Sequence, residues 1–179
     1  MAAAGVEVAA TRGEIRAGGL DRPEVAALLR EHLADMHRHT PPESIHALDL
    51  DELRAPGISF WSMWAGDTLM GCGALKEIDP GHGEIKSMRT AQGSMRQGVA
   101  RRMLAHILAE GRRRNYRRLS LETGSMAAFA PAHRLYAEAG FRLCGPFADY
   151  TDDPNSIYMT IEIEPAPASR APGAPAARV

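Results

Sequence analysis

The stretch "SMRQGVARRMLAHIL", from Ser94 to Leu108, begins as a polar, glycine-containing loop and continues as an amphipathic helix. Apolar residues recur there every three or four positions, the period of a helix with one buried face. A helix start exposes unpaired backbone N–H groups, and Gly98 allows a ligand to approach them closely, so the loop can hold an anion. An ordinary tight turn would have the same glycine, and the loop matches neither the Walker nor the dinucleotide-binding glycine pattern.

The composition of the 179-residue chain is that of one ordinary globular domain. A formal charge of −1 gives no overall attraction to nucleic acid or to a membrane surface. No apolar run approaches the roughly 18 residues that span a bilayer. The two cysteines, Cys72 and Cys144, lack the spacing of a disulfide or metal framework. We therefore expect a cytoplasmic protein without a metal and without nucleic-acid or membrane partners.

The two ends of the chain differ in composition from its middle. Residues 165–179 are rich in Pro and Ala and almost free of large apolar side chains, which is typical of a disordered tail. Residues 1–13 are expected to form a flexible N-terminus. Residues 14–164 are then the single folded domain.

Within this domain, strand and helix patterns alternate. Strands are expected in a hairpin over 58–78 and in five further stretches, 13–18, 81–90, 116–123, 141–150 and 156–164. Helices are expected over 20–39, 99–114 and 129–140, with one short helix around 47–53. This order predicts a mixed α/β domain with a largely antiparallel sheet, and it is unlike a doubly wound Rossmann fold.

A second motif is "LYAEAGF", residues 135–141, at the end of the last expected helix. Tyr136 lies four residues before Gly140, which stops the helix. A tyrosine hydroxyl in reach of a reacting centre can protonate a leaving group. The alternative is an ordinary core tyrosine that packs beside Leu135 and Phe141.

The two motifs together resemble the GNAT superfamily of acyl-CoA-dependent N-acyltransferases. The family's loop pattern is [Q/R]-x-x-G-x-[G/A], and "MRQGVA" matches it at Gly98 and Ala100. Its last helix commonly ends "lYeklGF", which "LYAEAGF" follows closely. The resemblance covers about residues 14–164 and implies a sheet of about seven strands, splayed between the fourth and fifth, with about four flanking helices.

The resemblance also implies acetyl-CoA as co-substrate. Its pantetheine arm would lie in the gap between 85–90 and 119–123, held by backbone groups of Met88 and Thr90, which would also polarise the thioester carbonyl. Backbone N–H groups would cradle the pyrophosphate at Gln97, Gly98, Val99, Ala100 and Arg101. The side chains of Arg96, Arg101 or Arg102 could add charged contacts to phosphate oxygens.

Two positions depart from the family pattern. Met95 stands where the family usually has Gln or Arg, so the first pyrophosphate contact must come from the backbone or from Arg96. Phe129 stands where many members have an asparagine at the start of the last helix. The second departure removes one common cofactor contact and leaves the cradle itself intact.

The reaction implied by the resemblance is direct attack of a neutral amine on the acetyl thioester. Tyr136 is the candidate for protonating the departing thiolate. An alkyl ammonium must first lose a proton, and Glu122 and Glu84 are the candidate bases, although either carboxylate could be purely structural.

The acceptor is expected to be a small amine or an amino acid. The acidic residues Glu43, Asp49, Asp51 and Glu52 could attract a cationic amine or could form a solvated loop. Arg89 and the turn before Ser156 could instead bind a carboxylate. A protein or peptide acetyltransferase and a non-catalytic acyl-CoA-binding module are the alternatives. Dimers are common among such proteins, so a homodimer is a further expectation.

Overall fold

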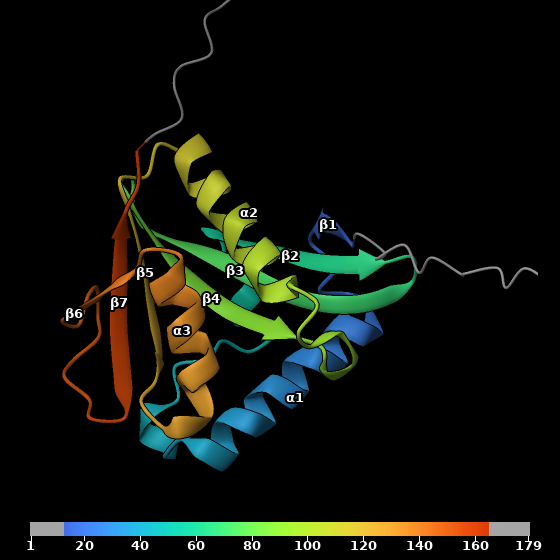
Figure 1. The fold of residues 1–179 in the computed structure, drawn as a ribbon, viewed down its shortest axis with the longest axis horizontal. Coiled ribbons are helices and arrows are strands. Elements are labelled where there is room, and N and C mark those ends of the chain that lie inside the picture. The colour runs from blue at the N-terminus through green and yellow to red at the C-terminus, as the bar shows by residue number, and fades with distance from the viewer. Residues whose placement is uncertain (1–12, 165–179) are drawn as a thin grey trace, which may run out of the picture.

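The computed structural model describes residues 13–164 (Figure 1). The expected flexible N-terminus, apart from Gly13, and the expected tail over 165–179 lie outside the described residues. In the described part, strands and helices follow one another in the predicted order. The strands are β1 Glu14–Ala17, β2 Ile58–Ala65, β3 Thr68–Asp79, β4 His82–Thr90, β5 Arg118–Gly124, β6 Arg142–Cys144 and β7 Ser156–Glu162. The α-helices are α1 Pro23–His39, α2 Val99–Arg113 and α3 Ala130–Glu138.

All seven strands form one sheet, in the order β1-β2-β3-β4-β5-β7-β6. Every neighbouring pair is antiparallel except β4 and β5, which run parallel. The predicted mixed, largely antiparallel seven-stranded sheet is thereby confirmed. The expected number of about four helices is too high for the described residues, which contain three α-helices.

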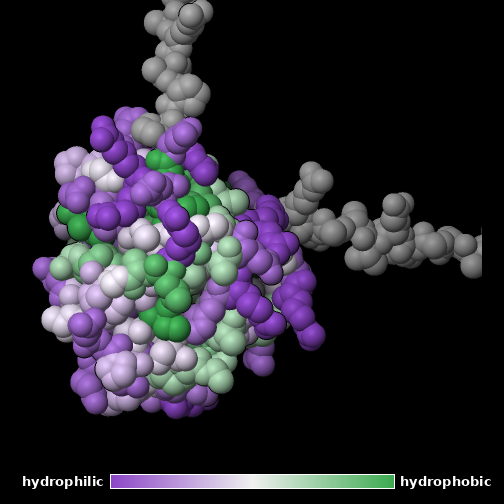
Figure 2. Space-filling model, turned by 60° about the vertical axis from the view of Figure 1, so that its left-hand side comes forward, coloured by the Kyte–Doolittle hydropathy of each residue, from purple (hydrophilic) through white to green (hydrophobic). Residues whose placement is uncertain are grey.

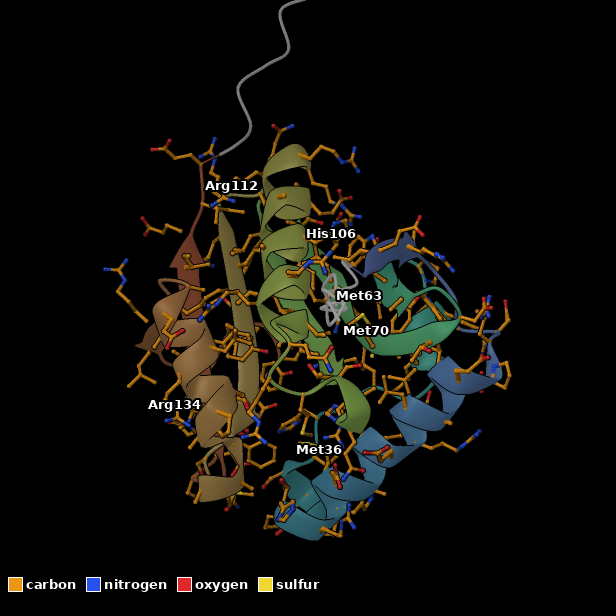
Figure 3. The ribbon with its side chains drawn as sticks, turned by 45° about the vertical axis from the view of Figure 1, so that its right-hand side comes forward. Met36, Met63, Met70, His106, Arg112 and Arg134 are labelled. Carbon is orange, nitrogen blue, oxygen red and sulfur yellow. The ribbon has the colours of Figure 1, made fainter. Side chains whose placement is uncertain are left out.

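The sheet separates two apolar clusters, because successive residues of a strand point to opposite faces. On one face, α2 and α3 pack on residues such as Leu75 and Ile85. Figure 3 shows Met63 and Met70 beside α2 in this layer. On the other face, α1 packs against Trp64 and Cys72. Burial of one large apolar side chain contributes about 2 kcal/mol. Because α2 buries several such side chains on the sheet, the helix is held firmly and its N-terminus has a defined position.

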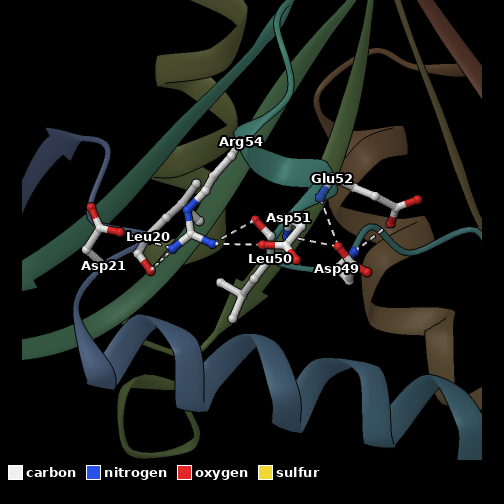
Figure 4. A network of polar contacts seen from close by, with 7 residues as sticks. All are labelled: Leu20, Asp21, Asp49, Leu50, Asp51, Glu52 and Arg54. Atoms are coloured by element: carbon white, nitrogen blue, oxygen red, sulfur yellow. Dashed lines mark hydrogen bonds and ion pairs between the residues drawn. The ribbon is translucent and has the colours of Figure 1, made fainter.

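The connection from α1 to β2 was expected to contain a helix around 47–53, and this is wrong. It has only two 3₁₀ turns, Pro42–Ser44 and Glu52–Arg54. The guanidinium of Arg54 pairs with Asp21 at 3.0 Å and Asp51 at 3.3 Å (Figure 4). Asp49 accepts the backbone N–H groups of residues 51 and 52 at 2.9 Å each, which favours a turn over a continuing helix.

The sheet ends in two edge strands, β1 and β6. On β6, Leu143 is 74% exposed, and Figure 2 shows small hydrophobic patches among hydrophilic residues on the side that carries α3, β6 and β7. The structure describes one chain, so the homodimer stays a prediction. Among residues 13–164, no helix is long and apolar enough to cross a membrane.

Candidate active site

The parallel strands β4 and β5 separate after a short paired stretch. Their ladder runs from His82 opposite Arg118 to Ile85 opposite Leu121 and ends there. Both strands continue beyond this point, β4 to Thr90 and β5 to Gly124. The splay therefore lies where the resemblance placed it, and it leaves the facing backbone edges of the two strands without a strand partner.

A β-bulge in β4 lies at the start of this splay. Between Ala74 and Cys72 of β3, the opposing part of β4 has one residue more, and Ser87 takes a positive φ of 53°. The side chain of Met88 packs beside the α2 cluster. A bulge takes backbone groups out of the regular ladder, and this bulge lies next to Met88 and close to Thr90 at the end of the strand.

The N-terminus of α2 lies close to the end of β4 in the chain, after the short turn Gln92–Ser94. Gly98 is the N-cap residue and has left-handed backbone angles, φ 77° and ψ 9°, and Arg96 also has a positive φ of 60°. The first helical backbone bond is donated by Arg102 to the Gly98 carbonyl at 3.0 Å. The N–H groups from residue 97 to residue 101 have no backbone acceptor among the described residues. Free N–H groups of this kind form an anion-binding concavity.

Space and anchoring both suit this concavity. A Cβ atom at Gly98 would meet no heavy atom within 4 Å, so the glycine faces open space. Val99, one residue later, is buried in the core cluster and fixes the first turn. The residues Gln97, Gly98, Val99, Ala100 and Arg101 are thus arranged as an anion cradle would require.

The three arginines proposed near the phosphates differ in their surroundings. Arg101 pairs with Glu138 of α3 at 2.7 Å, on the surface. Arg102 donates to the carbonyl of Gly13. Arg96 is exposed and has no ion-pair partner among the described residues, which makes it the freest of the three. Met95 beside it is 52% exposed and adds no polar group.

Tyr136 lies on the same face of the sheet as α2. Its side chain is only 6% exposed and belongs to the core cluster, with its ring edge-on to Phe141 at 5.6 Å between centroids. Its hydroxyl has no hydrogen bond to any described residue. Burial raises the pKa of Tyr136, so the hydroxyl keeps its proton at neutral pH. A protonated hydroxyl without a hydrogen-bond partner is available as a proton donor.

The two candidate bases lie on the opposite face of the sheet, since they alternate with Ile85 and Leu121 of the α2 cluster. Glu84 is fully buried and its Oε1 accepts from Lys86 Nζ at 2.9 Å and from the Tyr150 hydroxyl at 2.6 Å. Glu122 is half-buried and accepts one hydrogen bond, from Ser156 Oγ at 2.7 Å. Burial, only partly offset by the Ser156 bond, raises the pKa of Glu122.

These side chains form what we call the polar cluster: Glu84, Lys86, Glu122, Tyr150 and Ser156. Aromatic rings pack around its Tyr150, namely His46, Phe147 and Tyr158, with centroid distances of 5.0 to 5.5 Å. Beside the cluster, Asn155 Nδ2 donates a hydrogen bond to Ser44 Oγ at 3.2 Å, and we call this contact the latch. The connection after α1 and the connection before β7 therefore meet on this face of the sheet.

Arg89 and three of the acidic residues that were expected to attract the acceptor are bonded to other residues of the chain. Arg89 pairs with Glu31 at 2.8 Å and with Asp35, both on α1, so its charge is already neutralised. Asp49, Asp51 and Glu52 build the turns of Figure 4. A role of these residues in attracting the acceptor has no support from their contacts.

The model of the "Acetyltransferase (GNAT) family" matches residues 25–141. The chain belongs to the GNAT family. It is 58% identical over 146 residues to the uncharacterized N-acetyltransferase YsnE of Bacillus subtilis. The aligned region is 82% of this chain and 97% of YsnE. The N-acetyltransferase YedL of Escherichia coli is 48% identical, over 83% of this chain and 94% of YedL. The chain is therefore an acetyltransferase of this family.

Solved structures agree with this membership in the GNAT family. A Klebsiella pneumoniae protein described as an acyl-CoA N-acyltransferase superposes with a TM-score of 0.72 at 25% identity, over 85% of this chain and 98% of that one. A Bacillus subtilis acetyltransferase in complex with CoA superposes with a TM-score of 0.63 at 17% identity, over 84% and 99%. The second likeness shows the shared fold.

Phe129, which departs from the GNAT pattern, packs against the end of β5. Its ring covers Gly124 at the end of β5, where a Cβ atom would collide with it. One turn later, His133 Nε2 bonds the Gly124 carbonyl at 2.8 Å. In this GNAT protein, α3 is therefore tied to β5 by a ring contact and a histidine.

Sequence reasoning did not find Lys86, Tyr150 or Ser156. The spacing of Glu84 and Lys86, two residues apart on one strand face, was a signal that could have indicated their ion pair. Tyr150 and Ser156 gave no such signal, because Tyr150 lies in the β6–β7 connection and Ser156 at the start of β7, both far from Glu84 and Glu122 in the chain. No group of three or more His, Cys, Asp or Glu side chains within residues 13–164 could hold a metal ion.

Proposed function

We propose that this acetyltransferase moves an acetyl group from acetyl-CoA to the primary amine of a small molecule or an amino acid, by direct attack in a ternary complex. The observation that carries the small-acceptor part is the latch between Asn155 and Ser44. It joins two connections beside the polar cluster, and connections held together in this way suit a small acceptor better than an extended polypeptide.

The residues at the splay suit acetyl-CoA. The free N–H groups from Gln97 to Arg101 would bind its pyrophosphate, with Arg96 adding a charged contact. Backbone groups of Met88 and Thr90 would hold the pantetheine arm and polarise the thioester carbonyl. When bound, acetyl-CoA supplies the activated acetyl group, and the protein supplies its orientation and the proton transfers.

Glu122 is the proposed base. It has one hydrogen bond and no ion pair within 4 Å among the described residues, whereas Glu84 is bonded to Lys86 and Tyr150. Its raised pKa brings its basicity closer to the working pH, which favours removal of a proton from the ammonium of the acceptor. The resulting neutral amine has the lone pair that attacks the thioester carbon.

Tyr136 is the proposed acid. It lies on the α2–α3 face and would donate its proton to the sulfur as the C–S bond breaks, and it would regain a proton when the newly acylated nitrogen loses its own. The base and the acid thus stand on opposite faces of the sheet, on either side of the splay. That arrangement lets the acceptor and the leaving group approach from different sides.

The test is the release of free CoA from acetyl-CoA with a panel of amines, amino acids and peptides. We expect saturable turnover with one class of small amine or amino acid and little with peptides. Turnover confined to peptides would replace the small acceptor by a protein acceptor. Saturable acetyl-CoA binding without turnover on any acceptor would show a non-catalytic binding module.

A further inference from the structure

A buried ion pair lies beside the proposed base. Lys86 Nζ is 2.9 Å from Glu84 Oε1, with 8% and 3% of their side chains exposed. The Tyr150 hydroxyl donates to the same Glu84 oxygen at 2.6 Å and accepts from Lys86 Nζ at 2.8 Å. The three groups therefore form a closed triangle, in which the ammonium compensates the Glu84 carboxylate directly.

Glu122 lies on the same face of the sheet as this triangle. Glu84 pairs in the ladder with Ser120, and Glu122 is the next residue of β5 on that face. Groups from four parts of the chain face Glu122: His46 before β2, Lys86 and Glu84 on β4, Ser156 and Tyr158 on β7, and Tyr150 before β7. Among the charged ones, His46 and Lys86 lower the pKa of Glu122 and Glu84 raises it.

The position of one cation decides how two nearby carboxylates share protons. A buried carboxylate with a bonded ammonium stays ionised, while its unpaired neighbour keeps a higher proton affinity. Lys86 is bonded to Glu84 and only near Glu122. The ion pair has little net charge, so it leaves the proton affinity of Glu122 to be set mainly by burial.

We propose that Lys86 and Glu84 act as a positioning pair: the Lys86 ammonium neutralises Glu84, and Glu122 is thereby left as the carboxylate that exchanges the proton of the acceptor amine. The proposal rests on the proposed function, in which Glu122 is the base. It assigns Glu84 a role through Glu122 and removes it from direct proton transfer.

The experiment compares three variants, Glu84→Gln, Lys86→Met and the double variant. In Glu84→Gln the Lys86 ammonium has no carboxylate partner and stabilises the ionised form of Glu122 instead. The pKa of Glu122 and the acid limb of kcat/KM should therefore fall by about one pH unit. In the double variant both charges are gone, and both quantities return to within a few tenths of a unit of the wild type. Lys86→Met alone removes the cation and leaves the Glu84 carboxylate uncompensated, so the pKa of Glu122 should rise.

The pKa values are measured by NMR titration of the glutamate side-chain carboxyl carbons, with Glu122→Gln and Glu84→Gln used for assignment. Lys76→Met is the matched control, since Lys76 lies opposite Glu84 on β3 but has no ion pair among the described residues. It should leave the pKa of Glu122 unchanged. The double variant carries no buried charge at the pair, so it keeps the test usable if a single variant unfolds.

Two results would overturn the proposal. One is a Glu122 pKa that stays the same in Glu84→Gln. The other is a loss of turnover in Glu84→Gln at every pH that the double variant does not restore, because Glu84 would then act on the proton itself. The NMR titration needs no acceptor, so a failure of the proposed function, seen as no turnover in the wild type, is distinguished from a failure of this charge coupling.

Discussion

The two faces of the sheet at the splay present different chemical groups. On the α2–α3 face, the groups available to a ligand are mostly backbone N–H groups at the start of α2, set in an apolar layer with Tyr136. On the opposite face, the polar cluster is made of charged and hydroxyl side chains, beside rings from two connections. Backbone geometry resists most side-chain substitutions, whereas a side-chain cluster changes with each of its members. The two faces should therefore respond differently to mutation.

The largest effect is expected on the polar face, from Glu122→Gln. The amide cannot take a proton from the ammonium, so kcat/KM at neutral pH should fall by about 10³-fold. In the wild type, activity is lost as the pH falls through the raised pKa of Glu122, and this acid limb should vanish in the variant. Steady-state kinetics across pH measure both. Glu162→Gln on β7 is the control, and an unchanged pH profile in Glu122→Gln would assign the base elsewhere.

The next effect is expected on the α2–α3 face, from Tyr136→Phe. The ring still packs on Phe141, but the proton donor is gone, so kcat should fall by roughly 10²-fold with little change in acetyl-CoA affinity. Single-turnover kinetics and calorimetric titration with acetyl-CoA separate the two quantities. If kcat is unaltered, Tyr136 is a core residue only.

A smaller effect should follow from Gly98→Val. A β-branched residue at φ 77° is strained by about 1–2 kcal/mol, and its side chain enters the open space of the cradle, so acetyl-CoA binding should weaken by about tenfold. Gly93→Val in the same loop is the matched control, because Gly93 also faces open space but its φ is not positive. Equal acetyl-CoA affinities of the two variants would contradict the cradle.

The smallest effect concerns the far end of α2, away from both faces of the site. Glu110 bonds to Arg113 and Arg114, and these bonds lower its pKa to about 2. A lowered pKa in the folded state means that the stabilisation is complete above the ordinary glutamate pKa and is lost as the pH falls toward 2. Glu110→Gln should cost about 1 kcal/mol at pH 7 and leave kcat unchanged.

Thermal unfolding at pH 7, 4 and 2.5 checks the Glu110 prediction. The difference in melting temperature between wild type and Glu110→Gln should be a few degrees at pH 7 and shrink steadily toward pH 2.5. A difference that is independent of pH would mean that the carboxylate charge contributes nothing.

Much of this molecule followed from local patterns. The helix after Gly98, the hairpin over 58–78 and the strand order came from periodicity and turn residues, which act over a few residues of chain. The cradle loop and the helix that carries Tyr136 were placed for the same reason. Where local signals were weak, the expectation failed, as in the connection over 47–53, whose turns depend on Asp49 and on the contact of Arg54 with Asp21.

The sequence by itself determined the strand and helix order, the loop before the helix of Gly98 and the helix of Tyr136, because each rests on neighbours in the chain. Only the tertiary structure decided which charges remain free. Arg101 and Arg89 are neutralised by carboxylates of other helices, and Glu84 is held by a tyrosine 66 residues away, while Glu122 has a hydroxyl alone. Charge pairing depends on distance in space, and burial sets the proton affinity of whatever is left unpaired.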